Sequence, residues 1–342
     1  MIGGSVIVDQ DAGAAGFSDV QPFRPPPDIS NPVLELVDPD KIDYAFGAFQ
    51  RGYYLTALAI ATENARTGDA AALTLIGFLY ENGLGVPQDR KEAALWYGLA
   101  VEAGDPAAMV ELANLHANGD GVALDRKKAA DLLETALAKG RTEAAYGLGL
   151  VFLAGDGRPR DPEKAAAYFR QAAEAGDAEA QYALASLYQE GTGVAADPAE
   201  AAAWMGRAAD SGNIAAAVEY AIMLFNGTGV SANEKLAYAW FQLAARAGNP
   251  IAQNRLARLY ASGRGVRQDE ERAAVWHLRA QRAGLNDPWL DEMMVRLGEE
   301  KRARALAASG EADAGLPEEG AGLAPPASGS PSAAGAPVPK PK

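Results

Sequence analysis

Residues 177–212 read DAEAQYALASLYQEGTGVAADPAEAAAWMGRAADSG, and this stretch decides the fold. Its first half places Ala180 and Leu184 on one side of a helix, and its second half does the same with Ala201 and Trp204. The EGTGVAADP stretch between the halves contains two glycines, which allow a positive φ where the first helix ends. The stretch therefore predicts a helix–turn–helix unit.

The start of the second helix carries its own signal. Asp197 precedes Pro198, an order that suits an N-cap residue followed by the first helical position. A residue of similar capping ability recurs every 36 residues along the chain. These residues are Asp89, Asp125, Asp161, Asn233 and Asp269.

The unit repeats six times without an insertion, and positions are numbered below from the first residue of each 36-residue block. Every block ends in glycine and carries G-x-G at positions 15 and 17. Alanine fills positions 4 and 25 in every block, while position 28 holds a large residue such as Trp204. One hairpin buries too little apolar surface to be stable alone, so the blocks are expected to stack into an all-α solenoid. The blocks begin at Asp69, Asp105, Arg141, Asp177, Asn213 and Asn249.

The pattern resembles the Sel-one-like repeat, a relative of the tetratricopeptide repeat, over about residues 42–307. The departures are local: His116 and Leu224 replace a tyrosine, Arg158 replaces a valine and Tyr238 replaces an alanine. The resemblance implies a right-handed superhelix of helical pairs with a concave binding surface. In block one the matching residues are Ala72, Ile76, Gly77, Tyr80, Gly83, Gly85, Val86, Asp89, Ala93, Ala94, Trp96, Ala100, Ala103 and Gly104.

The flanks of the array differ from the repeats. We expect a capping hairpin at residues 41–68, six repeats at 69–284 and one capping helix at 285–307. Residues 1–40 carry seven acidic residues against one arginine, and residues 308–342 consist mostly of Ala, Gly, Pro and Ser. Such segments bury too little apolar surface to fold alone, so both ends are predicted to be disordered.

Charge and composition exclude several partners. With 45 acidic and 31 basic residues the formal net charge is −14, which repels nucleic acid and anionic membranes. No stretch is long and apolar enough to insert into a membrane, and the first sixteen residues lack the basic region of a secretory signal. We expect a soluble monomer in the bacterial periplasm or cytoplasm, bound to a protein or peptide segment.

No catalytic, cofactor or metal site is predicted. The G-x-G pair occurs six times without a preceding strand, so it is read as turn geometry rather than a phosphate loop. The chain has no cysteine, and its two histidines lie far apart in the repeat series. His116 occupies a packed tyrosine position and is expected in the core, whereas His277 is expected on the outer face. A nucleophile–base constellation is therefore unsupported, and we expect the protein not to be an enzyme.

Binding residues are sought where the repeat pattern is absent. Positions 3, 6, 10 and 13 of the first helices vary, and in a tetratricopeptide-like stack they face the concave side. Tyr146 and Tyr182 could equally pack between neighbouring helices, an alternative that the sequence leaves open. Arg255 and Arg258 would attract an acidic or carboxylate end of a ligand. The predicted groove residues are Phe78, Val110, Tyr146, Leu150, Leu153, Tyr182, Val218, Ile222, Phe225, Asn254, Arg255 and Arg258.

Two functions follow from these observations. The leading one is a scaffold or regulatory adaptor that holds a partner segment in the groove, and the family resemblance suggests bacterial signalling as its setting. The alternative is a structural or assembly factor of the cell envelope that uses the acidic convex face or the tails. A hydrolase is disfavoured by the scarcity of catalytic groups.

Overall fold

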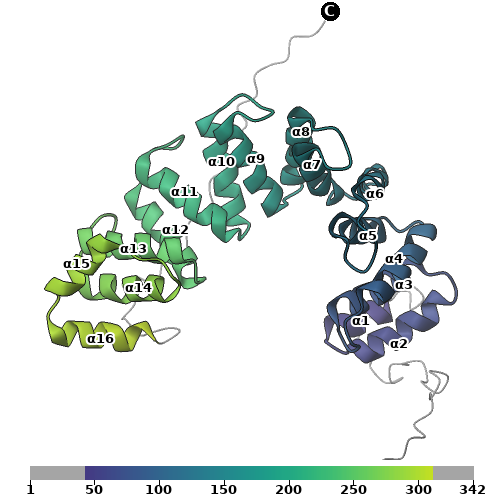
Figure 1. Ribbon diagram of the computed structural model, residues 1–342, viewed down its shortest axis with the longest axis horizontal. Coiled ribbons are helices and arrows are strands. Elements are labelled where there is room, and N and C mark those ends of the chain that lie inside the picture. Colours follow the sequence, from purple (N-terminus) through teal and green to yellow (C-terminus); the bar gives the residue numbers. More distant parts are fainter. Residues whose placement is uncertain (1–42, 311–342) are drawn as a thin grey trace, which may run out of the picture. The chain divides into compact units, whose positions relative to one another are not determined.

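A computed structural model describes residues 43–310, and every regular element in that range is an α-helix (Figure 1). The predicted all-α architecture is confirmed for these residues. The predicted disordered ends lie outside the described residues, with the exception of residues 308–310. Residues 308 and 309 belong to the last helix, and residue 310 follows it.

The chain divides into two compact units, residues 1–141 and 142–342. In unit 1 the helices are α1 (Tyr44–Gln50), α2 (Tyr54–Ala65), α3 (Ala70–Asn82), α4 (Arg90–Glu102), α5 (Pro106–Asn118) and α6 (Arg126–Ala138). In unit 2 they are α7 (Ala144–Ala154), α8 (Pro162–Glu174), α9 (Ala178–Glu190), α10 (Pro198–Asp210), α11 (Ile214–Asn226), α12 (Glu234–Arg246), α13 (Pro250–Ser262), α14 (Glu270–Arg282), α15 (Pro288–Arg296) and α16 (Glu299–Ser309).

Each repeat is a hairpin of two helices, such as α9 with α10 (Figure 1). Within each unit the second helix of a repeat also packs against the first helix of the next repeat, as α10 does against α11. The apolar face of each helix is thus shared by its own hairpin and by its neighbour. This arrangement confirms the predicted stacking of 36-residue units within unit 1 and within unit 2.

The two glycines of each turn have different tasks, which the fourth repeat illustrates. Gly191 ends α9 with φ +72°, a left-handed conformation that glycine adopts without strain. Gly193 also has a positive φ, and a Cβ atom placed there would lie 2.1 Å from the carbonyl oxygen of Pro162 in the preceding repeat. The second glycine therefore permits close approach between successive repeats.

The predicted N-caps are confirmed at the second helices. The Asp197 carboxylate accepts hydrogen bonds from the backbone N–H groups of Ala199 and Glu200 at 2.9 and 3.2 Å. The backbone N–H of the same residue donates to the carbonyl of Tyr188 across the turn, at 3.0 Å. Corresponding backbone bonds form where His116 and Leu224 replace that tyrosine, because they do not depend on the side chain.

The third repeat lacks the cap of its first helix. Its first position holds Arg141, whereas the other five blocks place Asp or Asn there as the N-cap. Helix α7 accordingly has 11 residues, against 13 in the other five first helices, and its N-cap residue Glu143 makes no side-chain capping bond. The missing capping residue thus explains why α7 begins late.

Small and large side chains alternate in the core as the sequence predicts. All twelve alanines at positions 4 and 25 are at most 4% exposed. Trp204, Trp240 and Trp276 at position 28 are buried, while the residues at that position in the first three repeats are half-buried. The prediction of a buried Trp204 is therefore confirmed.

A second row of large side chains, at position 29, is more deeply buried than position 28 in the first three repeats. It faces position 9 of the same hairpin, where glycine stands opposite the rings of Tyr97 and Phe169. The residues of this row are Tyr97, Leu133, Phe169, Met205, Phe241 and His277.

The N-terminal cap keeps the repeat register. Helix α1 turns into α2 at Arg51 and Gly52, as predicted, and Ala57 is fully buried. Tyr54 lies 36 residues before Arg90, so α2 stands where the second helix of a repeat would stand. Gly85 correspondingly packs against the start of α2.

The prediction of a single C-terminal capping helix is wrong. Leu297 is extended, with ψ 127°, and with Gly298 it divides the segment into α15 and α16. Leu290, Met293 and Leu297 are buried, so α15 and the residue that follows it add apolar side chains to the core before the chain turns back. Helix α16 then packs along α14.

Candidate protein-binding surface

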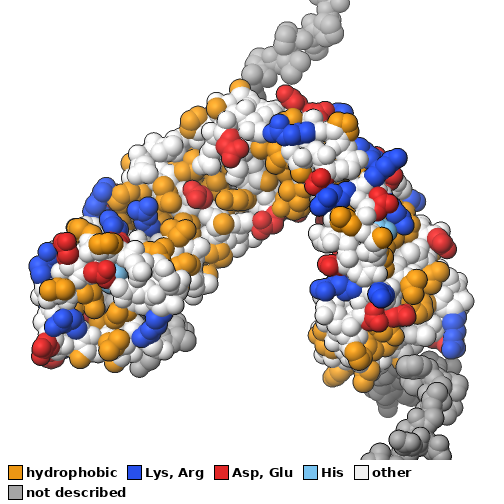
Figure 2. All heavy atoms as spheres, in the orientation of Figure 1, with side chains coloured by type: hydrophobic (Ala, Val, Ile, Leu, Met, Phe, Trp, Pro, Cys, Tyr) orange, Lys and Arg blue, Asp and Glu red, His pale blue; other side chains and the backbone are white. Residues whose placement is uncertain are grey.

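Four predicted binding residues of unit 2, here called the apolar strip, remain accessible: Leu150, Leu153, Ile222 and Phe225. Leu150 is 44% exposed and the other three are half-buried. They lie on the first helices α7 and α11. They are accessible because the core side of each helix is filled by the repeated alanines and leucines. Figure 2 shows hydrophobic side chains gathered over the helices of unit 2.

Helix α9 separates the two halves of the apolar strip. Its residues at positions 10 and 13 are Ser186 and Gln189, so the apolar character is interrupted there. Tyr146 on α7 and Tyr182 on α9 are both half-buried. The Tyr146 ring packs 5.8 Å from the ring of Phe169, which matches the alternative that this tyrosine fills space between helices.

Phe225 is partly covered by a basic side chain. The Arg264 guanidinium lies 4.0 Å from the centre of the Phe225 ring and is held by the carboxylate of Glu234. A cation over an aromatic face is attracted by the ring's negative potential. A ligand would therefore meet the edge of Phe225 and the plane of Arg264 together.

Two of the predicted groove residues are not accessible. Val218 is 4% exposed and Asn254 is 8% exposed, so neither lines an open surface. The Asn254 side chain instead donates a 2.7 Å hydrogen bond to the Asp287 carboxylate. The burial of Val218 and Asn254 corrects their assignment to the groove.

The assignment of Arg258 as a free charge for the ligand is also corrected. Its guanidinium donates to both oxygens of Asp287, at 2.6 and 2.8 Å, and lies over the Trp289 ring. Burial acts to raise the pKa of Asp287, but the hydrogen bonds from Arg258 and Asn254 and the Arg258 charge outweigh it and lower the pKa to about 2. Arg255 is exposed and remains the candidate for contact with an acidic ligand group.

The predicted residues of unit 1 stand in a more acidic setting. Phe78 and Val110 are half-buried, and the Phe78 ring meets the Phe49 ring edge-on at 5.5 Å. Burial raises the pKa of Glu111, and the neighbouring Glu81 carboxylate raises it further. The first repeat therefore has Glu81 at position 13, where the third repeat has Leu153 and the fifth has Phe225.

The histidines are placed differently from one another. His116 is 8% exposed, as predicted for a core substitution, and its Nδ1 lies 3.2 Å from the Ala123 carbonyl oxygen. The prediction that His277 lies on the outer face is wrong, because this side chain is fully buried at position 29. Its Nε2 lies 2.7 Å from a carboxylate oxygen of Asp291. The large residue present at position 29 of every block was the signal that the sequence interpretation missed.

Two further properties bear on the kind of site. Among residues 43–310 no group of three or more potential ligating His, Asp or Glu side chains is arranged to hold a metal ion. No helix in that range combines the length and the apolar character needed to cross a membrane.

Comparisons with solved structures agree with this architecture. The protective antigen c5321 of uropathogenic Escherichia coli, described as displaying an SLR fold, matches with a TM-score of 0.66 and 29% identity over 73% of this chain. This chain spans 54% of that antigen's length. A Sel1 repeat protein from Oxalobacter formigenes matches with a TM-score of 0.64 and 29% identity, over 70% of this chain and 98% of the other.

Comparisons of sequence give the family. Curated protein sequences contain no match to this chain. The family model described as Sel1 repeat matches six consecutive segments, at residues 70–105, 106–140, 142–177, 178–213, 214–249 and 250–285. These segments follow the predicted blocks and cover more than half of the sequence. The chain belongs to the Sel1 repeat family.

Proposed function

We propose that the chain is a regulatory scaffold that binds a segment of a partner protein along the apolar strip of unit 2. Sel1 repeat proteins generally mediate protein–protein interactions, and their repeats are generally non-enzymatic. The observation that carries the proposal is the exposure of Leu150 on α7, a helix whose core-facing side is already filled by other residues. Bringing such surface out of contact with water favours association.

The arrangement suggests the size of the ligand. Helices α7 and α11 stand on either side of α9, so the two halves of the strip are roughly 20 Å apart, about two helix diameters. A partner helix of about 13 residues would span that distance at 1.5 Å per residue. Its apolar side chains would contact Leu150 and Ile222, and an acidic residue beyond them would reach Arg255.

The setting of this scaffold is proposed from its relatives. The two solved proteins above come from bacteria, which supports an adaptor role in a bacterial cell. A scaffold of this kind would restrain a signalling partner by holding one of its segments.

A peptide-selection experiment tests the proposal. Peptides of about 15 residues selected from a random library on the full-length protein should share apolar residues at helical spacing. Their affinity should fall at least about tenfold for the double variant Leu150→Asp/Ile222→Asp, because buried apolar anchors carry most binding energy.

The matched control is Val295→Asp/Leu306→Asp, which makes the same change in charge at two exposed apolar residues of α15 and α16. This control should bind the selected peptides like the wild type. The selected peptides could instead bind the double variant Leu150→Asp/Ile222→Asp as tightly as the wild type, while circular dichroism shows that the variant is folded. That result would place binding elsewhere on the protein.

A further inference from the structure

The N-terminal end of the repeat array exposes large apolar side chains. Phe46 on α1 is 46% exposed, and Tyr53 and Leu55 at the start of α2 are 62% and 67% exposed. Helix α1 is the first helix that the structure describes, and it buries Ala45 and Ala48 against the core. Its opposite side therefore has no preceding hairpin to cover it among the described residues.

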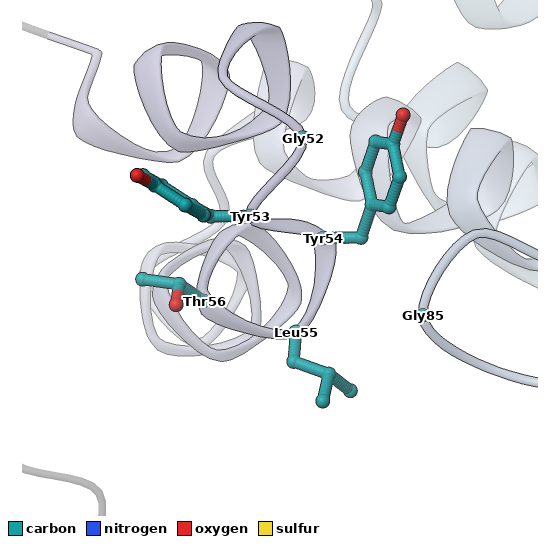
Figure 3. A pocket seen from close by; sticks show the side chains of 6 residues that line it. All are labelled: Gly52, Tyr53, Tyr54, Leu55, Thr56 and Gly85. Atoms are coloured by element: carbon teal, nitrogen blue, oxygen red, sulfur yellow. The ribbon is translucent and has the colours of Figure 1, made fainter.

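A hollow of about 380 Å³ lies beside these residues. It is lined by residues 52–56 at the turn into α2 and by Gly85 from the first repeat (Figure 3). Figure 3 shows the side chains of Tyr53, Tyr54 and Leu55 pointing in three different directions around the start of α2. A shallow, apolar surface of this kind can accept small aliphatic side chains.

The C-terminal end of the array is built differently. The exposed side of α16 carries Glu299, Glu300, Lys301 and Arg304. Terminal units of a repeat array normally present a polar outer surface, since no further repeat covers them. The four charged residues of α16 meet that requirement around the exposed Leu306, whereas Arg51 is the one charged residue between Phe46 and Leu55 at the N-terminal end.

We propose that residues 33–37, Val-Leu-Glu-Leu-Val, bind this N-terminal end face, here defined by Phe46, Tyr53 and Leu55. The segment lies outside the described residues and ends six residues before Asp43, where the described part of the chain begins. Six residues reach at most about 20 Å, so the end face lies within range of the segment. Four of its five side chains are aliphatic, which suits the exposed apolar surface.

Charge supports the same pairing. The segment contains Glu35 and is followed by Asp38 and Asp40, whereas the turn beside the end face presents the exposed Arg51. A covalently attached segment also has a high effective concentration at its binding face, which favours it over a second copy of the protein. Residues 1–40 are predicted not to fold alone, and a short apolar stretch within them can still bind to a face that is already folded.

Hydrogen exchange on the full-length protein tests this pairing. Backbone amides of residues 33–37 should exchange at least about tenfold more slowly than those of residues 5–9, because binding shields them from solvent. Leu55→Asp should abolish that protection, since it places a charge on the end face. Leu95→Asp is the matched control, because Leu95 is 63% exposed on α4 and belongs to a repeat rather than to the end face.

A second variant separates the segment from its receiving face. Leu34→Asp/Leu36→Asp should also abolish the protection, whereas Ile7→Asp/Val8→Asp, a matched change at least 36 residues before α1 in the sequence, should leave it intact. Unprotected amides at 33–37 in the wild type would overturn the proposal. Protection that survives Leu55→Asp, or that appears only at concentrations where the protein dimerises, would overturn it as well, the latter result assigning the face to a second copy.

Discussion

The ring of Phe169 occupies the space that a side chain on residue Gly149 would need. A Cβ atom placed on Gly149 would lie 2.5 Å from two carbon atoms of that ring. The second repeat has the opposite combination of sizes, with the larger Ala113 at position 9 and the smaller Leu133 at position 29. Glycine at position 9 therefore makes room for the ring at position 29 in the first and third repeats, whereas the fifth repeat combines Ala221 with Phe241.

Gly149→Ala should destabilise the protein although alanine favours helices. The added methyl group overpacks the contact with Phe169, which typically costs about 1–3 kcal/mol. Chemical denaturation of unit 2 should therefore show a lower free energy of unfolding. The double variant Gly149→Ala/Phe169→Leu recreates the pair of the second repeat and should lose less stability than the two single losses added together.

The control for that series is Gly98→Ala. Gly98 lies within α4, and a Cβ atom placed there would meet no other atom within 4 Å. Alanine should raise stability there by about 0.5–1 kcal/mol through helix propensity alone. Equal effects at Gly98 and Gly149 would show that Phe169 does not constrain the second site.

Arg141→Asp should supply the cap that α7 lacks. An aspartate at this position begins three of the other five repeats, and capping side chains contribute about 0.5–2 kcal/mol. Arg141→Ala is the reference, because it removes the arginine charge near Glu111 without adding a cap. The aspartate variant should be the more stable of the two in thermal unfolding, and its amides at residues 143–145 should exchange more slowly. If both variants unfold alike, the late start of α7 has another cause.

Trp204→Ala should cost about 3–5 kcal/mol, as is usual for truncating a large buried side chain. Trp204 is 7% exposed, and the Arg207 guanidinium lies 4.4 Å from its ring centre. Because neighbouring repeats stabilise one another, the loss should concentrate in the hairpins around α10 and make unfolding multistate. Hydrogen exchange resolved along the chain measures this. A loss below about 0.5 kcal/mol would be too small for a buried tryptophan.

The ion pair between Arg258 and Asp287 makes stability depend on pH. The pKa of Asp287 is about 2 in the folded protein, below the ordinary value of 3.8. A depressed pKa stabilises the fold above the ordinary value, and that contribution disappears as the pH falls from about 4 through 2. Its size is about 1–2 kcal/mol, reduced because Arg258 is partly exposed.

Asp287→Asn isolates this contribution, because asparagine is also a good N-cap residue for α15. The wild type should be more stable than the variant at pH 7, and the difference should shrink by pH 2.5. Thermal unfolding of both proteins across that range measures the difference. A gap of constant size would show that the Asp287 carboxylate does not titrate differently in the folded protein.

Local rules in the sequence predict most of the fold. The glycine pairs, the capping residues such as Asp197, and the alanines at positions 4 and 25 each act within one hairpin or between neighbours. These signals repeat, so each copy supports the others. The capping defect at Arg141 could also have been read from the sequence, because it is the one block start that is neither Asp nor Asn.

Contacts outside the repeat pattern were harder to predict. Asn254 and Arg258 lie 33 and 29 residues before Asp287, in a segment where the 36-residue register ends, so their partner could not be found from spacing. His277 was misplaced because a polar residue suggested a surface, although its position holds a large core side chain in every other repeat. The sequence indicated the apolar strip only through leucine, isoleucine and phenylalanine residues at positions that the repeat pattern does not explain.

Site-specific photo-cross-linking in the native cell tests the central claim most directly. A photoreactive phenylalanine analogue at Leu150 should give a covalent adduct of defined mass, and the same analogue at Leu306, an exposed residue of α16, should not. The adduct at Leu150 should disappear when Ile222→Asp is added, because both residues would contact one ligand. Adducts that form at Leu306 but not at Leu150, or that persist at Leu150 with Ile222→Asp, would contradict binding along the apolar strip.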